Sequence, residues 1–334
     1  MDGQKTSLWK KFTSSSNFGL LVGFVVLLIV AWFITPAMFT ASSIFGMLRN
    51  NAVYAILAIA MMLVIIPGGI DLSVASTLAF AGIASTIYAS ANPEAPVIIS
   101  ILIAMGIGLA CGAFNGLLVG YFKMVPMIAT LGTMYIFRGF AFLISGGNWW
   151  FPHQYPMTYQ NVAIGSTFGV FNILWIVVIA YIIAAIFFGH TTLGRRIYAI
   201  GTSSASSQVA GIKENNVTFL AFLISGALCG LAGMLYVANY AMGFYGMAEG
   251  YEMQAIAICI LGGVNINGGR GKVSGVVIGF LMMSVITYFI GLLPGLSVWQ
   301  DAIKGAIIII AVLINVFTAR SAEKAALKER GALI

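Results

Sequence analysis

The stretch Thr191–Asn216 reads TTLGRRIYAIGTSSASSQVAGIKENN and is the longest polar interruption in a chain that is otherwise largely apolar. It contains Arg195, Arg196 and Lys213, and no acidic residue precedes its last three positions. Because loops rich in Lys and Arg stay on the cytoplasmic side of a membrane, we place this stretch in the cytoplasm. The Ala, Gln and Val residues of 204–212 predict one short amphipathic helix. The stretch is therefore either a basic knob for a cytoplasmic partner or an ordinary loop that only fixes topology.

The composition places the chain among integral membrane proteins. Of its 334 residues, 60% are hydrophobic and 7% are charged, and the mean hydropathy is +1.02. A soluble domain carries about 25% charged residues. The apolar runs supply about ten spans of about 20 residues each, and they are far too long for barrel strands of about ten residues. We therefore predict an all-α fold, a polytopic bundle of about ten transmembrane helices that forms a single domain over residues 1–334.

The distribution of Lys and Arg orients these spans. A cytoplasmic amino terminus puts most of the 16 Lys and Arg residues on the cytoplasmic side, as the positive-inside rule requires. The exceptions are Arg49, Arg138 and Lys304. The predicted spans are residues 18–35, 45–66, 71–90, 95–122, 125–146, 168–190, 216–242, 252–264, 273–293 and 299–318. Both termini are then cytoplasmic, and the predicted cytoplasmic parts are the segment 1–17, the loop 191–216 and the tail 319–334.

Pro and Gly interrupt the apolar runs at two places. Pro67-Gly68-Gly69 separates two long runs, and Asp71 and Ser73 follow at once. Such residues commonly cap the next helix. The second interruption, Leu261–Lys272, contains Gly-Gly-Val-Asn where the first contains Gly-Gly-Ile-Asp, a weak echo that is compatible with an internal duplication. We expect some spans to be broken, which a membrane tolerates where the backbone is buried or lines a cavity.

A glycine stripe marks one predicted span. Gly108, Gly112, Gly116 and Gly120 recur every four residues on one helix face, which lets a neighbouring backbone approach closely. We expect the stripe to pack within one chain, and the alternative is a seam between two copies.

Motifs of an enzyme are absent from the sequence. A nucleotide-hydrolysing loop needs Ser or Thr after Gly-Lys, but Val273 follows Gly271-Lys272. The two His have no catalytic partner nearby, and the three Cys lie in apolar runs without paired spacing. We therefore expect that the chain is not an enzyme by itself and that it binds no metal or other cofactor.

The few charged residues bear on how such a chain is driven. Asp71, Arg138, Asp301 and Lys304 are the candidates for charge within the spans, and all four lie near span ends. An ion-coupled carrier usually has ionisable residues at mid-membrane. A chain without them takes its energy from elsewhere, which favours the basic stretch as the contact for a separate ATPase. The alternative is an ion-coupled secondary solute carrier.

Four sequence blocks in a fixed order resemble a known family over about residues 20–318. The blocks are GGIDLS at 68–73; ATLGT at 129–133, with Arg138-Gly139; GRRIYAIG at 194–201, with AGI at 210–212; and Tyr251-Glu252 through to Gly268–Gly271. Together they resemble the permease subunits of bacterial sugar ABC importers, the branch that includes ribose, galactose, xylose, arabinose and autoinducer-2 systems. Thr202 and Ser203 depart from the Gly-Asn that follows the glycine in many relatives.

The resemblance implies a multi-pass protein of the bacterial inner membrane that pairs with a second permease copy or a sister permease. Cytoplasmic ABC ATPase subunits, which bind the ATP and Mg, would lie below, and a periplasmic sugar-binding protein would dock above. No nucleic acid is implied as a partner. Carried over residue by residue, the segment that couples to the ATPase comprises Gly194, Arg195, Arg196, Ala199, Gly201, Ser204, Ala210 and Gly211.

Two further sets of candidate residues follow from the chemistry of a neutral, hydroxyl-rich solute. Such a solute needs hydrogen-bond partners rather than a counter-charge. Candidates for the translocation path are Asp71, Ser73, Asn115, Thr130, Thr133 and Asn239. Hydrogen bonds between helices are the alternative role for these side chains. Candidates for docking the binding protein by charge matching are Arg49, Arg138, Glu249 and Glu252, with an internal partner as the alternative for Arg138.

Overall fold

The computed structural model describes residues 18–293, 295, 299–300, 302–303, 305–306 and 309. The predictions for segments 1–17 and 319–334, for most of the span 299–318, and for Asp301 and Lys304 lie outside these residues.

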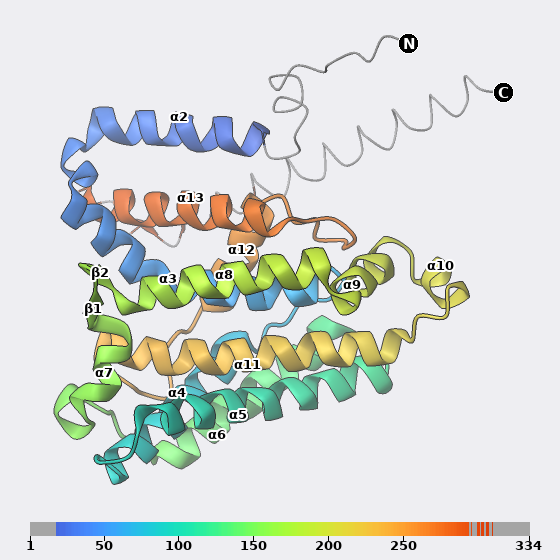
Figure 1. Ribbon diagram of the computed structural model, residues 1–334, viewed down its shortest axis with the longest axis horizontal. Helices are drawn as coiled ribbons and strands as arrows, with labels where there is room; N and C mark the ends of the chain where they lie inside the picture. Colours follow the sequence, from blue (N-terminus) through green and yellow to red (C-terminus); the bar gives the residue numbers. More distant parts are fainter. Residues whose placement is uncertain are drawn as a thin grey trace.

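The described chain is a bundle of helices with one small hairpin (Figure 1). The helices are α2 (Phe18–Ile34), α3 (Ala41–Ile65), α4 (Val74–Ala91), α5 (Val97–Gly116), α6 (Pro126–Ser145), α7 (Met157–Ile164), α8 (Asn172–His190), α9 (Thr192–Thr202), α10 (Ser204–Val209), α11 (Glu214–Tyr240), α12 (Tyr251–Leu261) and α13 (Val273–Leu292). Short helical turns lie at η1 (Pro36–Phe39), η2 (Leu117–Tyr121) and η3 (Pro152–Gln154). Strands β1 (Ser166–Thr167) and β2 (Val170–Phe171) pair antiparallel.

Seven helices of the described chain are long and apolar enough to cross a membrane, and they are α3, α4, α5 with its continuation η2, α6, α8, α11 and α13. Two shorter apolar helices, α2 and α12, accompany them. The polytopic all-α fold is therefore confirmed. The count of about ten spans and the placement of the termini stay predictions.

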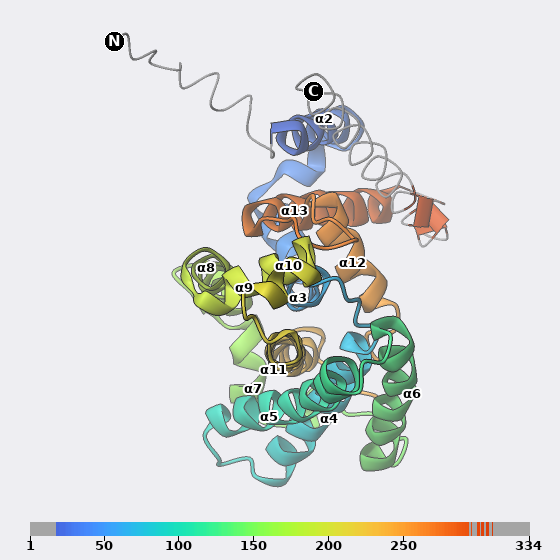
Figure 2. The ribbon, with the colours of Figure 1, turned by 90° about the vertical axis from the view of Figure 1, so that its right-hand side faces the viewer.

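The long helices lie roughly side by side, so the molecule has two distinct ends (Figure 1). Helices α9 and α10 project at one end, and the β1–β2 hairpin and α7 lie at the other. We call these the coupling end and the hairpin end. Seen from the coupling end, α11 lies between α3 on one side and α4 and α5 on the other (Figure 2). From α3 to α11 each described span starts at the end where the previous one stopped, and α12 then leads back to the coupling end, where α13 begins.

Close packing of α5 on α11 holds the centre of the bundle together. A Cβ atom built on Gly108 would lie 2.1 Å from the carbonyl oxygen of Gly226. The reverse also holds, since a Cβ on Gly226 would lie 2.2 Å from the Gly108 oxygen. Gly112 and Gly116 face α11 in the same way. The glycine stripe thus packs within the chain as predicted, because only glycine lets two backbones come this close in lipid.

Helix α12 crosses only part of the bilayer. Its 11 residues span about 16 Å, whereas the hydrocarbon core is about 30 Å thick. The preceding residues 241–250 turn back into the bundle, where the Met247 side chain meets Gly82 and the Tyr251 ring lies 4.2 Å from the Tyr54 ring. The predicted span 252–264 is therefore a half-length helix preceded by a re-entrant, non-helical segment.

The α5–α11 contact generates a stability prediction. Gly108→Ala introduces a methyl group into the Gly226 backbone, and we expect it to lower the free energy of unfolding by about 1–3 kcal/mol. Gly106→Ala is the matched control, because nothing lies within 4 Å of its Cβ position. Thermal denaturation of both variants in detergent measures the difference. Equal melting temperatures for the two variants would contradict the packing described above.

Candidate coupling segment and translocation site

Two capped helices build the basic stretch. The Thr191 hydroxyl accepts a hydrogen bond from the Gly194 amide at 3.0 Å and starts α9. The Ser203 hydroxyl accepts one from the Ser206 amide at 3.2 Å and starts α10. At the tip, Val209 is 92% exposed. The chain therefore presents a small helical knob at the coupling end.

The sequence analysis predicted one helix in this stretch and missed α9. Gly194, Ile197 and Ile200 are the buried residues of α9, at a spacing of three. This spacing is the available signal, since residues three apart share a helix face. Arg195 and Arg196 are exposed, and Arg195 donates to the His190 carbonyl at 3.2 Å. The amphipathic helix of the stretch is therefore α9, which carries both arginines on its outer side.

The other predicted coupling residues fall into two groups. Ala210 and Gly211 are exposed at the tip, where Gly211 takes a positive φ of 74°. Ala199 and Ser204 are half-buried, and the Ser204 hydroxyl donates to a Glu214 carboxylate oxygen at 2.8 Å. The exposed group is available to a partner, and the second group belongs to the base of the knob.

Gly201 fixes α9 to the rest of the bundle. A Cβ atom on Gly201 would lie 1.8 Å from the Ile66 carbonyl oxygen and 2.5 Å from the Gly269 nitrogen. The Gly269 amide in turn donates to the Ile66 oxygen at 2.9 Å. Ile66 ends α3 at the first chain interruption, and Gly269 lies in the second. Helix α9 therefore contacts both interruptions at one point.

A tyrosine adds a second contact between α9 and the later interruption. The Tyr198 hydroxyl donates to the Gly271 carbonyl at 2.7 Å. Burial raises the pKa of the Tyr198 phenol above its ordinary value, so the hydroxyl keeps its proton at neutral pH. This hydrogen bond is therefore present throughout the physiological pH range.

A buried polar cluster lies at the first interruption. The Ser73 amide and hydroxyl donate to one Asp71 carboxylate oxygen at 2.8 and 2.6 Å. The Asn115 amide nitrogen donates to the Ser73 hydroxyl at 2.7 Å, and the Asn115 side-chain oxygen has no hydrogen-bond partner among the described residues. The cluster joins the chain interruption to α5 and leaves one buried acceptor open.

Thr130 of α6 supports the same interruption from the other side. Its hydroxyl accepts from the Leu72 amide at 3.0 Å. It lies 2.8 Å from the Pro126 carbonyl and 3.2 Å from the Ile70 carbonyl, both of which are acceptors. Thr133 is also buried, and its hydroxyl bonds within α6. Four of the six candidates for the path thus meet at this interruption, near the coupling end.

Asn239, the sixth candidate for the path, lies instead toward the hairpin end. Its side-chain oxygen accepts from the Arg49 Nε at 2.9 Å, and its carbonyl accepts from an Arg49 terminal nitrogen at 3.2 Å. The Arg49 guanidinium also lies 4.7 Å from the centre of the Phe171 ring. One candidate for the path and one for docking are therefore joined in a single internal contact.

The remaining docking candidates differ in exposure. One Arg138 nitrogen donates to the carbonyls of Tyr245 and Met247, each at 2.7 Å. Arg138 thus has the internal partners that the sequence analysis named as its alternative, and it holds the re-entrant segment. Glu249 is exposed and Glu252 is half-buried. A docking role stays a prediction for all four residues.

The sequence analysis placed residues 242–252 as an outer connection and missed its return into the bundle. The available signal was a concentration of glycine, at Gly243, Gly246 and Gly250, without the run of apolar residues that a helix needs. Gly243 exchanges two backbone hydrogen bonds with Trp150, at 2.8 and 2.9 Å. This pairing fixes where the re-entrant segment begins.

The chain matches the family described as branched-chain amino acid transport system, permease component, over residues 43–312. It is 33% identical over 299 residues to the ribose import permease protein RbsC of Escherichia coli strain K12, which covers 88% of this chain and 92% of that protein. It is 28% identical over 297 residues to the L-arabinose ABC transporter permease protein AraH of Azospirillum brasilense, covering 89% and 86%. It is 29% identical over 266 residues to the autoinducer 2 import system permease protein LsrC of Yersinia enterocolitica, covering 79% and 73%. No solved structure matches the chain.

The chain therefore belongs to this permease family. The resemblance to the permeases of sugar ABC importers is confirmed, and the chain is a multi-pass membrane protein that is not itself an enzyme.

The cluster at the first interruption generates a prediction. Thr130→Val keeps the side-chain shape but removes the acceptor of the Leu72 amide, and an unpaired buried donor costs about 1–3 kcal/mol. We expect a lower melting temperature in detergent for this variant. Thr130→Ser is the matched control, because it keeps the hydroxyl. A Thr130→Val variant as stable as Thr130→Ser would show that this hydrogen bond is dispensable.

Proposed function

We propose that the chain is the translocation subunit of an ATP-driven importer for a sugar or sugar-like solute. The relatives named above are permeases for ribose, L-arabinose and autoinducer 2. In this proposal the chain lies in the bacterial inner membrane, pairs with a second permease, and binds no cofactor of its own. ATP and Mg belong to cytoplasmic ATPase subunits, and a periplasmic binding protein delivers the solute.

The observation that carries this proposal is the contact of Gly201 with Ile66 and Gly269. It joins the exposed basic helix α9 to both places where a span is interrupted. A push on α9 therefore acts directly on backbone that is not held by a continuous helical ladder. A packed interface changes between discrete arrangements and does not deform continuously. An ATPase docked on Arg195 and Arg196 would thus move the interruptions.

The path in this proposal runs beside the first interruption. Asp71, Ser73, Asn115 and Thr130 supply hydroxyl, amide and carboxylate groups there, which suits a solute rich in hydroxyl groups. The open acceptor on Asn115 is the group best placed to gain a partner when a neighbouring segment moves. Asp71 also supports the second candidate function, an ion-coupled secondary carrier. A buried carboxylate within a membrane bundle is typical of such carriers.

Charge reversal on α9 tests the ATPase contact. We expect Arg195→Glu with Arg196→Glu to lower ATP-driven uptake more than tenfold, because an acidic ATPase surface would then face like charges, which cost several kcal/mol at an interface. Lys123→Glu is the control, since Lys123 is an exposed cation outside the stretch 191–216. Uptake and ATPase stimulation are measured in liposomes that contain the permease, the ATPase and the binding protein. Wild-type rates for the double variant would refute the contact.

The same liposomes separate the two functions. Uptake that needs ATP and the ATPase supports the importer. Uptake by the permease alone under a proton gradient would instead make it a secondary carrier, and Asp71→Asn would then abolish transport.

The link at Gly201 has its own test. Gly201→Ala pushes a methyl group against the Ile66 carbonyl, so we expect an ATPase that still binds but drives uptake at least several-fold more slowly. Gly189→Ala is the matched control, because its Cβ position is open. Co-purification measures binding, and uptake per ATP hydrolysed measures coupling. If uptake per ATP in Gly201→Ala equals that of the control, force does not pass through this contact.

A further inference from the structure

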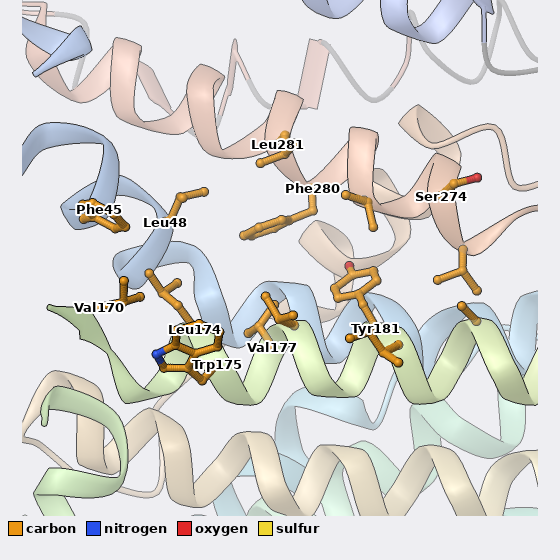
Figure 3. Close-up of a pocket in the computed structure, with 15 residues that line it drawn as sticks. Phe45, Leu48, Val170, Leu174, Trp175, Val177, Tyr181, Ser274, Phe280 and Leu281 are labelled. Carbon is orange, nitrogen blue, oxygen red and sulfur yellow. The ribbon is translucent and has the colours of Figure 1, made fainter. Parts of the chain in front are cut away.

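An apolar groove runs along the outside of the bundle between α8 and α13, with α3 as its floor (Figure 3). The cavity has a volume of about 570 Å³, within the range of about 300–1,000 Å³ that ligand pockets occupy. Its lining residues are Phe45, Leu48, Val170, Leu174, Trp175, Val177, Val178, Tyr181, Ile182, Ala185, Val273, Ser274, Val277, Phe280 and Leu281. The Tyr181 hydroxyl donates to the Ala55 carbonyl at 3.2 Å. Its polar group is therefore already bonded within the protein, and the groove lining is mainly apolar.

The groove opens to the outside of the described bundle. Val178 and Ile182, which line it, are 47% and 54% exposed on α8. Along α8 the lining runs from Leu174 to Ala185, a distance of about 17 Å. This is close to half of the hydrocarbon thickness of about 30 Å. A flexible acyl chain from one leaflet therefore matches the groove in polarity and in length, and it restores the dispersion contacts that an empty groove would lose.

A second hollow lies at the coupling end, at the loop that leads into α13. Its volume is about 380 Å³, and it is lined by Leu20, Tyr198, Gly262, Gly263, Gly269, Arg270, Gly271 and Lys272. Arg270 and Lys272 are exposed there. Lys272 directly precedes Val273, which is the first residue of α13 and lines the groove. The two exposed cations of the hollow therefore lie next along the chain to the end of the groove at Val273.

The exposed charges indicate which membrane leaflet supplies the acyl chain. Two exposed cations stand at the coupling end, which the positive-inside rule places in the cytoplasm. At the hairpin end the groove is bordered by Phe45, Val170 and Trp175, and the nearby Arg49 is already bonded to Asn239. Clusters of basic residues at the cytoplasmic surface attract anionic lipids. The complementary ligand therefore carries its negative charge at the coupling end.

We propose that the α8–α13 groove binds one acyl chain of an anionic phospholipid of the cytoplasmic leaflet, with the headgroup phosphate at Arg270 and Lys272. This site is separate from the transport path, and its occupancy does not depend on the function proposed above. The loop that holds the phosphate also carries Gly269 and Gly271, which contact α9. A bound lipid therefore stiffens the base of the coupling knob.

Native mass spectrometry of the full-length permease in detergent tests the site. The probes are dioleoyl phosphatidylglycerol, which is anionic, and dioleoyl phosphatidylcholine, which has the same chains without net charge. We expect the wild type to retain the anionic lipid preferentially. Arg270→Gln with Lys272→Gln should reduce that preference roughly tenfold, because each basic residue near the surface contributes measurably to anionic-lipid binding. Ala185→Trp fills the groove and should lower retention of both lipids.

Matched controls separate the site from general effects. Lys123→Gln removes an exposed cation elsewhere, and Leu102→Trp adds the same ring at a lipid-facing position of α5 that is 61% exposed. Both should retain lipid as the wild type does. If either control loses lipid as much as its partner variant, or if the wild type retains the two lipids equally, the proposal is overturned.

Trp175 provides a second measurement, which reports on the groove by fluorescence rather than by retained lipid. Because Trp175 lines the groove, phosphatidylglycerol with brominated chains should quench its fluorescence, measured as the difference between the wild type and Trp175→Phe. No difference in quenching would overturn the proposal. So would a change in the dimer fraction of Ala185→Trp without any loss of lipid, because a second copy of the chain would then occupy the groove.

Discussion

The carbonyl oxygen of Ile66 is the point on which the coupling end of the molecule depends. A span that stops inside a bundle leaves backbone groups without helical partners, and lipid cannot bond them. Here the Gly269 amide bonds the Ile66 oxygen, and α9 closes over both residues because Gly201 has no side chain. One requirement, to satisfy the backbone where α3 ends, thus brings together three segments that lie far apart in the sequence. The contact between the knob and the interruptions is a consequence of that requirement.

Much of the fold followed from hydropathy and charge, because both act locally. The long apolar runs became helices near their predicted positions, and the stripe from Gly108 to Gly120 packed against α11. The return of residues 241–250 into the bundle was not predicted. That segment has no periodic pattern, and its course is set by partners that are distant in sequence, which are Trp150, Arg138 and Gly82. The helix α9 was missed because its buried face has only three residues.

The candidate site was predictable in its residue types and not in its grouping. Asp71, Ser73, Asn115 and Thr130 were singled out as polar residues within spans, and they meet at one interruption. Asn239 was selected on the same grounds, yet it pairs with Arg49 toward the hairpin end. A side chain's chemistry does not specify its depth or the helix face opposite it. Those depend on how α5, α6 and α11 pack, and the close glycine contacts that set this packing are long-range.

The re-entrant segment divides the bilayer crossing of α12 into two mechanically unequal halves. From Tyr251 inward, an α-helical ladder resists bending, since every displacement there breaks several hydrogen bonds at once. From Ala241 to Gly250, the backbone is held to other segments by the Arg138 guanidinium and by the two hydrogen bonds between Gly243 and Trp150. Releasing this half requires only a few bonds to open and no helix to unwind. The helical half leads to the second interruption, where Gly269 contacts Gly201 of α9, and the non-helical half faces the hairpin end. In the importer proposed above, a displacement applied at α9 would therefore reach the hairpin end as a change in loop shape.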